Sequence, residues 1–422
     1  MYNFLKTNYG VSDEIAAILK KAEKDTQPYM KIAEEIAQYN TLKVMNSFKK
    51  HGISEAHLGG TTGYGYDDIG RDALDAVYAD VFGAEDAIVR HNIVNGTMAL
   101  AACMYGILRP GDTLVAVTGK PYDTLEEVIG IRGENTGSLK DFGVNYKQVD
   151  LKDGKPDFDG IKKAVTADTK MVSIQRSRGY AWRDSFSVDE IGEIISFVKN
   201  INKDIVCFVD NCYGEFVDIK EPTEVGADIM AGSLIKNPGG GIAQSGGYVA
   251  GKKEYVELIS YRLTCPGIGR ECGATLGQNR LMYQGFFMAP HTVCQSIKAG
   301  ILCSYVFEAL GCSVMPSYKD SRSDIITSVK LGSAEKMVAF CKGVQQGSPI
   351  DSYLSPEPCP MPGYDSDVIM AAGTFVSGAS IEASSDGPVR EPYIIYYQGG
   401  LTYESAVLPI AAAAELVKKL DN

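Results

Sequence analysis

Short apolar segments alternate with segments of helical periodicity between residues 87 and 250. The strand-like segments are residues 87–94, 113–118, 144–151, 171–175, 205–210, 229–234 and 247–250, and helix-like segments at 97–108, 158–165 and 188–198 lie between them. Alternation on this scale predicts a mostly parallel central sheet with helices on both faces. Ligands of such sheets bind beyond the C-terminal ends of the strands, so side chains that follow a strand are candidates for a site.

Two such side chains suggest one chemistry. Lys236 follows the strand-like segment 229–234 and precedes Asn-Pro-Gly-Gly-Gly, and Asp210 ends the segment 205–210. A lysine that forms a Schiff base and an aspartate that keeps a pyridine nitrogen protonated are the protein's contribution to pyridoxal phosphate (PLP) chemistry. Taken singly, a solvated lysine and a helix-capping aspartate are the ordinary interpretations. The combination, with the features below, favours PLP.

A PLP site also needs groups that hold the phosphate and the ring. Asn95, Gly96 and Thr97 lie between a predicted strand and a predicted helix, where backbone N–H groups at the helix N-terminus favour an anion. Ser233 offers a further hydroxyl, and Tyr122 follows the next strand, where its ring can stack on the pyridine. An ordinary helix cap and a core tyrosine are the alternatives.

Two further tyrosines lie in a glycine-rich loop at residues 58–68. Tyr64 and Tyr66 alternate with glycines there, which is a poor setting for aromatic side chains with a purely structural role. We therefore predict that they reach a cofactor phosphate, within one chain or across a subunit boundary.

An amino-acid substrate requires a partner for its carboxylate, and the planar arginine fork suits it best. Arg176 and Arg178 follow a predicted strand, and Arg390 follows a Gly-Pro turn. All three are predicted substrate-binding residues, with an exposed surface arginine as the ordinary alternative.

Composition excludes several other classes. A net charge of −12 argues against sequence-independent nucleic-acid binding. No apolar run approaches the roughly 20 residues of a membrane span, and residues 1–12 do not resemble a signal peptide. The ten cysteines include no Cys-x-x-Cys, and the four histidines lack metal-ligand spacing. We expect a cytoplasmic protein without a metal site.

The ordered motifs resemble a known family. They are Gly63-Tyr-Gly-Tyr-Asp-Asp-Ile-Gly-Arg71, Asn95-Gly-Thr97, Pro121-Tyr122, Asp210, Ser233-x-x-Lys236-Asn-Pro-Gly-Gly-Gly, Cys265-Pro-Gly-Ile-Gly-Arg270 and Tyr397-Gln-Gly-Gly-Leu401. This set resembles fold-type I PLP enzymes of the cystathionine/methionine gamma-lyase superfamily. Within it, the chain is most similar to the methionine gamma-lyase-like branch called "aluminium resistance protein", over nearly its whole length.

The resemblance implies a homotetramer built from intimate dimers, in which Tyr64 and Tyr66 complete the neighbouring site. It also implies roles for the strand-end residues, with Lys236 as the Schiff-base lysine, Asp210 at the ring nitrogen, Tyr122 on the ring, and Gly96, Thr97 and Ser233 near the phosphate. It further implies an N-terminal helical arm (1–57), a large PLP-binding α/β domain (58–295) and a small C-terminal α+β domain (296–422).

Two departures concern substrate recognition. Better-known members place an arginine inside a late strand, where this chain has Tyr396-Tyr397-Gln398. The usual Ser-Pro-x-Asn-Pro stretch is replaced by Gln175-Arg-Ser-Arg-Gly-Tyr180. The cofactor is therefore predicted more firmly than the substrate.

The resemblance implies a carbon–sulfur lyase acting on cystathionine, cysteine or methionine. Lys236 would take the alpha proton, and thiol elimination would leave a 2-oxo acid and ammonia. Gamma-replacement, transamination and racemisation use the same residues and remain open. A non-catalytic PLP-fold binding or resistance protein is the alternative from another class.

Overall fold

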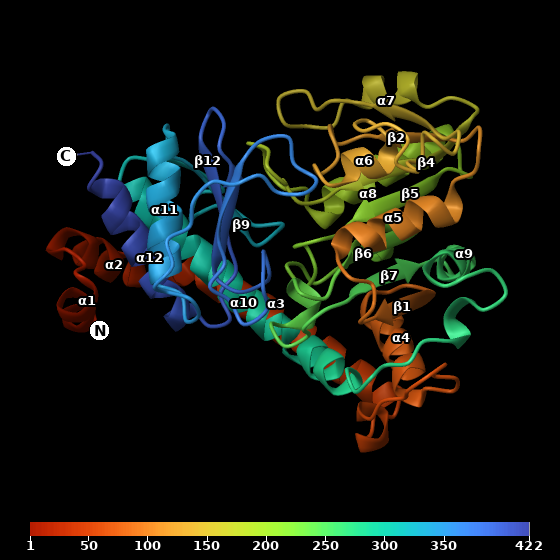
Figure 1. Cartoon of the computed structure of the whole chain (residues 1–422), viewed down its shortest axis with the longest axis horizontal. Helices are drawn as coiled ribbons and strands as arrows, with labels where there is room; N and C mark the ends of the chain where they lie inside the picture. The colour runs from red at the N-terminus through yellow and green to blue at the C-terminus, as the bar shows by residue number, and fades with distance from the viewer. Residues whose placement is uncertain (422) are drawn as a thin grey trace.

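A seven-stranded sheet forms the larger half of the molecule (Figure 1). The computed structural model describes residues 1–421. The strand order is β1-β7-β6-β5-β4-β2-β3. The strands are β1 Asp86–Arg90, β2 Thr113–Ala116, β3 Asn145–Gln148, β4 Thr169–Gln175, β5 Val206–Asp210, β6 Ile229–Ser233 and β7 Gly247–Gly251. From β6 to β3 the pairs are parallel, whereas β7 runs antiparallel to β1 and β6. The predicted mostly parallel sheet is confirmed.

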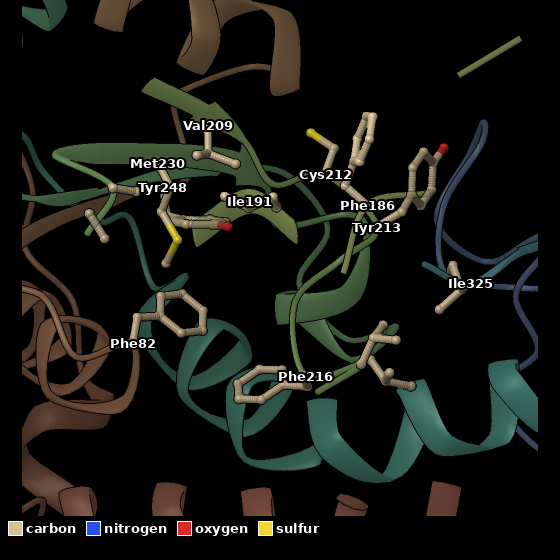
Figure 2. Close-up of a cluster of buried hydrophobic side chains, with 14 of the residues drawn as sticks. Phe82, Phe186, Ile191, Val209, Cys212, Tyr213, Phe216, Met230, Tyr248 and Ile325 are labelled. Atoms are coloured by element: carbon tan, nitrogen blue, oxygen red, sulfur yellow. The ribbon is translucent and has the colours of Figure 1, made fainter. Parts of the chain in front are cut away.

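Helices cover both faces of this sheet. They are α4 Ile69–Val81, α5 Gly96–Ile107, α6 Leu125–Ile129, α7 Phe158–Ala164, α8 Val188–Ile201 and α9 Lys253–Leu263. Side chains alternate between the faces: Val209 and Met230 join a core with Ile191 of α8 (Figure 2), whereas Phe208 and Ala231 join a core with α5 and α9. The predicted helices at 97–108, 158–165 and 188–198 are confirmed.

The smaller sheet has five antiparallel strands in the order β10-β11-β12-β9-β8. They are β8 Ser313–Met315, β9 Ile326–Lys330, β10 Val368–Ala371, β11 Ser384–Pro388 and β12 Ile394–Gln398, packed with α11 Ala334–Gln346 and α12 Tyr403–Lys418. Irregular chain separates β10 from β11. Sequence analysis did not predict β8 and β9.

Two long helices connect the halves. Helix α10 (Asn279–Ala309) runs from the large core into the small one, and α3 (Gln27–Lys50) packs along it (Figure 1). The helices α1 (Tyr2–Tyr9) and α2 (Asp13–Asp25) pack on the small core, whereas α3 packs on the large core. The three predicted domains stay a prediction, but the boundary at 295/296 falls inside α10.

Four short 3-10 helices complete the described elements: η1 Glu55–Leu58, η2 Pro222–Val225, η3 Asn237–Gly239 and η4 Gly269–Glu271. Within residues 1–421, no helix combines the length and apolar character needed to cross a membrane.

Candidate active site

A cavity of about 200 Å³ lies beyond the C-terminal ends of the parallel strands. Gln175, Asp210 and Ser233, the last residues of β4, β5 and β6, line it. The remaining lining residues include Lys236, Tyr122 and the segment Asn95–Thr97. The strand-end residues that the sequence singled out around Lys236 therefore share one cavity, because neighbouring parallel strands end at the same sheet edge.

Lys236 and Asp210 are both partly buried, and each faces the cavity. The Lys236 amine lies 3.7 Å from the centre of the Tyr213 ring. Tyr213 was missed by sequence analysis; it holds a left-handed φ of 69°, a costly conformation that places its ring beside the amine. Burial raises the pKa of Asp210, whereas the Cys212 N–H at 3.1 Å and the Lys236 amine favour its charged form. A protonated ring nitrogen at Asp210 would stabilise that charge further.

The N-terminus of α5 provides an anion-binding corner. Asn95 caps this helix by accepting the Met98 N–H at 2.8 Å, and the Thr97 and Thr124 hydroxyls lie 2.7 Å apart. The buried Ser233 hydroxyl has no hydrogen-bond partner among the described residues. A Cβ on Gly96 would approach Ser233 Cβ to 3.4 Å, so the glycine keeps this corner open. These residues fit a phosphate group.

Tyrosines form part of the wall of the cavity. The Tyr122 hydroxyl lies 2.8 Å from that of Tyr364, which comes from the long segment before β10. Burial raises the pKa of Tyr122 well above its usual value, so its ring is a neutral surface. Asp386 of β11 also lines the cavity. Sequence analysis predicted Tyr122 but missed Tyr364 and Asp386.

The glycine-rich loop lies outside its own cavity. Tyr64 and Tyr66 are 72% and 58% exposed, and their rings stack with centres 5.6 Å apart. Arg71, which is 1% exposed, fixes the loop by donating to the carbonyls of Gly65 at 2.6 Å and Gly273 at 3.0 Å. An ordered loop with exposed aromatic rings is suited to contact another subunit, and this role stays a prediction.

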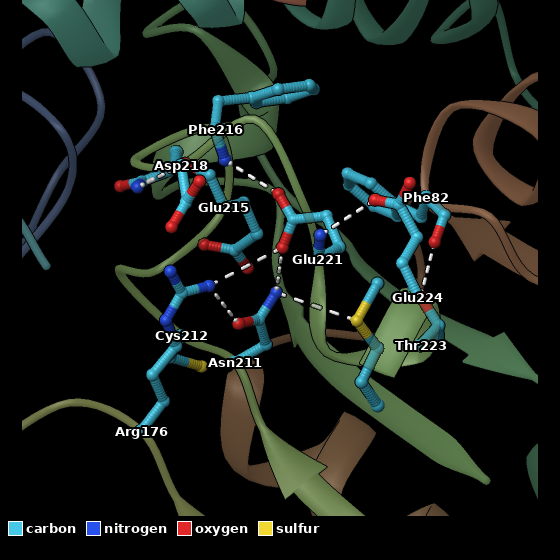
Figure 3. A network of polar contacts seen from close by, with 12 residues as sticks. Phe82, Arg176, Asn211, Cys212, Glu215, Phe216, Asp218, Glu221, Thr223 and Glu224 are labelled. Atoms are coloured by element: carbon cyan, nitrogen blue, oxygen red, sulfur yellow. Dashed lines mark hydrogen bonds and ion pairs between the residues drawn. The ribbon is translucent and has the colours of Figure 1, made fainter. Parts of the chain in front are cut away.

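The structure does not bring Arg176 into the cavity. Its side chain is fully buried and donates to Asn211 at 2.9 Å, with Glu221 at 3.5 Å (Figure 3). Glu221 also accepts from the Phe216 N–H at 2.8 Å. The predicted substrate-binding role of Arg176 is therefore not supported, because its guanidinium is already used in a buried polar network.

Arg178 and Arg390 also lie outside the residues that line the cavity. Arg178 is buried, with its Nε 3.5 Å from Asp324, and it donates to the Met315 carbonyl at 2.7 Å. Arg390 is half exposed and pairs with Asp365 at 3.0 Å. Their predicted contact with a substrate carboxylate is not supported, since each already has partners elsewhere. Among residues 1–421, no arginine lines this cavity, and no cluster of three or more metal-ligating side chains occurs.

The mostly parallel sheet, the smaller antiparallel sheet and the lysine cavity between them define the architecture of fold-type I PLP enzymes. The same fold occurs in the pyridoxal-5'-phosphate-dependent protein YhfS from Escherichia coli, with a TM-score of 0.59 at 19% identity over 90% of this chain and 96% of that chain.

The model of the methionine gamma-lyase family matches residues 15–418. The chain belongs to this family. It is 54% identical over 404 residues to the uncharacterized protein YnbB of Bacillus subtilis. The aligned region covers 94% of this chain and 96% of the relative.

Solved structures of close relatives agree. A protein of Listeria monocytogenes, described as a candidate cystathionine beta-lyase involved in aluminium resistance, has a TM-score of 0.93 and 51% identity over 95% of this chain and 99% of its own. A carbon-sulfur lyase involved in aluminium resistance from Clostridium novyi has a TM-score of 0.93 and 55% identity over 97% of both chains.

Proposed function

We propose that this protein is a PLP-dependent carbon–sulfur lyase that converts a sulfur amino acid and water into a thiol, a 2-oxo acid and ammonium. The observation that carries the proposal is the position of Lys236, whose buried amine shares one cavity with Asp210 and with the open anion-binding corner at Gly96 and Ser233. The names of the structural relatives support the reaction class. PLP, when bound, supplies an electron-withdrawing ring that makes the alpha proton of an amino acid acidic.

The residues of this chain then have separate tasks. Asp210 would keep the ring nitrogen protonated, Tyr122 would lie against the ring, and the N–H groups of α5 with Thr97 and Ser233 would hold the phosphate. The Lys236 amine takes the alpha proton at the point where the substrate enters. Burial of the cavity keeps bulk water away from this proton and strengthens the contact between Asp210 and the ring.

The proposal includes a homodimer, within a larger tetramer, in which each subunit lends its loop to the other. The exposed Tyr64 and Tyr66 are the residues that would approach the partner's phosphate site. The rigid anchoring of the loop by Arg71 supports this arrangement, because a preorganised loop loses little conformational entropy on assembly.

The test is to load the purified protein with PLP and incubate it with cystathionine, cysteine and methionine, while thiol and 2-oxo acid are measured together. Equal amounts of the two products are expected from at least one substrate. A 2-oxo acid without thiol would indicate transamination, and loss of optical activity without either product would indicate racemisation. No reaction with any of the three would contradict the proposal.

A further inference from the structure

A second carboxylate faces the cavity from the smaller sheet. Asp386 of β11 lines the cavity together with Lys236 and is 6% exposed. Among the described residues, no ion pair joins it to Lys236. The Tyr180 hydroxyl lies close enough to lower its pKa, yet that hydroxyl has no hydrogen bond of ordinary geometry. Asp386 therefore faces the cavity with unused bonding capacity, whereas the Tyr180 hydroxyl beside it is buried and lies outside the residues that line the cavity.

An unpaired buried carboxylate is costly, because it loses hydration without gaining a partner. Such a group either takes up a proton or binds a cation. Burial raises the pKa of Asp386 to about 6, although the Tyr180 hydroxyl and the Lys236 amine lower it. At neutral pH the carboxylate is mostly ionised, and a positively charged group of a ligand would be its ion-pair partner.

A cluster of tyrosine rings adjoins this carboxylate, which pairs in register with Tyr396 and lies within reach of the Tyr180 hydroxyl. The centre of the Tyr180 ring lies 5.7 Å from that of Tyr122, 5.9 Å from that of Tyr364 and 5.1 Å from that of Tyr396. The face of each ring is the negative part of its quadrupole and attracts cations, and ammonium groups in particular. Of these tyrosines, Tyr122 and Tyr364 line the cavity with Asp386, so a cation bound there would meet both a carboxylate and aromatic rings.

We propose that Asp386, with the ring of Tyr364, binds an ammonium group that lies beyond the sulfur atom of the substrate. This inference rests on the proposed lyase function and narrows its substrate class. The alpha-amino group of a substrate is used beside Lys236, so the second cation lies in the part of the molecule that leaves as the thiol. Cystathionine carries such an ammonium group, whereas methionine and cysteine do not.

Two substrates that differ by one charge test the subsite. S-(2-aminoethyl)-L-cysteine and S-propyl-L-cysteine have side chains of equal length, ending in an ammonium and a methyl group. Wild-type holoenzyme is expected to favour the aminoethyl compound in kcat/KM by roughly 10- to 100-fold, as for a charged hydrogen bond in a buried site. Asp386→Asn should remove this preference, which is measured as the ratio of the two kcat/KM values so that any effect on the shared chemistry cancels.

The matched control is Asp365→Asn, which removes an exposed carboxylate that pairs with Arg390 outside the cavity. It should leave the preference unchanged. An unchanged preference in Asp386→Asn, or an equal loss with both substrates, would overturn the assignment, since Asp386 would then serve the fold or a step common to both.

The pH dependence of the preference gives a second readout. The titratable groups near Asp386 are Lys236, the Cys341 thiol and the phenols of Tyr122, Tyr180, Tyr213, Tyr364 and Tyr396. Effects on the shared chemistry cancel in the ratio of the two kcat/KM values. Because only the ionised carboxylate attracts the ammonium, the ratio should decline as the pH falls through about 6. A constant ratio from about pH 5 to about pH 8 would contradict the proposal.

Binding without cleavage separates this inference from the lyase proposal. L-Lysine and L-2-aminoheptanoate have side chains of the same length as these two substrates, again ending in an ammonium and a methyl group, but they contain no carbon–sulfur bond. The loaded wild-type protein should bind lysine roughly 10-fold or more tightly than the neutral analogue by calorimetry, and Asp386→Asn should not. If no thiol is released from any substrate, the lyase proposal fails while this difference still supports the subsite. Equal affinities would refute the subsite alone.

Discussion

Replacing Arg176 by methionine tests whether this arginine serves the fold or the substrate. The structure gives it one hydrogen bond at 2.9 Å to Asn211 and an ion pair at 3.5 Å with Glu221, all fully or nearly fully buried. Removing one member of a buried pair usually costs about 3–5 kcal/mol, because the other charge stays behind without its partner.

The structure places the expected cost near the lower end of that range. Without Arg176, Glu221 still accepts the Phe216 N–H at 2.8 Å and the Asn211 amide at 2.9 Å. Burial raises the pKa of Glu221, and the charge of Arg176 lowers it. Without Arg176, the Glu221 carboxylate can therefore also take up a proton. We expect a loss of about 3 kcal/mol at neutral pH. The loss should shrink as the pH falls, since the protonated form of Glu221 needs no cation.

The assay is urea unfolding followed by circular dichroism, at about pH 8 and about pH 5.5. Arg176→Met with Glu221→Gln should recover most of the loss, because the stranded charge is then gone. Arg390→Met is the control; it removes a half-exposed pair with Asp365, so its effect should stay below about 1 kcal/mol. If Arg176→Met unfolds like this control while kcat/KM falls by about 30-fold or more, Arg176 binds substrate and the reasoning is wrong.

Three further predictions concern the cofactor site. Borohydride reduction of the PLP-loaded protein should abolish its visible absorbance and fix PLP on Lys236, and Lys236→Ala should retain some PLP without releasing thiol; peptide mapping that finds PLP on another lysine would contradict this. Asp210→Asn should keep the fold and much of the cofactor but lose several orders of magnitude in rate, since an amide does not hold the ring proton; near-normal turnover would place the ring partner elsewhere. Mixed dimers of Lys236→Ala with the double variant Tyr64→Phe, Tyr66→Phe should regain activity at one site, whereas none despite proven subunit exchange would show that the loop acts within its own chain.

The sheet-edge part of the site could be predicted because its positions follow from a local pattern. Each apolar segment fixes a strand, and parallel pairing brings the strand ends together without further information. Asp210, Ser233 and Lys236 were found in this way, and they line one cavity in the structure. Tyr213 was missed because its left-handed backbone is not visible in the residue pattern.

The small-domain side of the site was not predictable by the same reasoning. Asp386 and Tyr364 reach the cavity only because the antiparallel sheet docks against the large domain, and this docking depends on contacts between distant segments. The predictions for the substrate-binding arginines were not supported for a related reason. A sequence shows that Arg176 is charged but not that Glu221, far along the chain, is its buried partner.

The absence of an arginine from β12 explains why the Asp386 carboxylate on β11 has no ion-pair partner there. Asp386 pairs in register with Tyr396 on the neighbouring strand, so the two side chains lie next to each other on one face of the small sheet. A guanidinium at a neighbouring position of β12 could form an ion pair with Asp386 and use its charge. Instead, Tyr396 packs 5.1 Å from the Tyr180 ring and leaves the carboxylate facing the cavity. If the proposed subsite is correct, the departure from the better-known superfamily members gives this wall a negative charge that attracts an ammonium group.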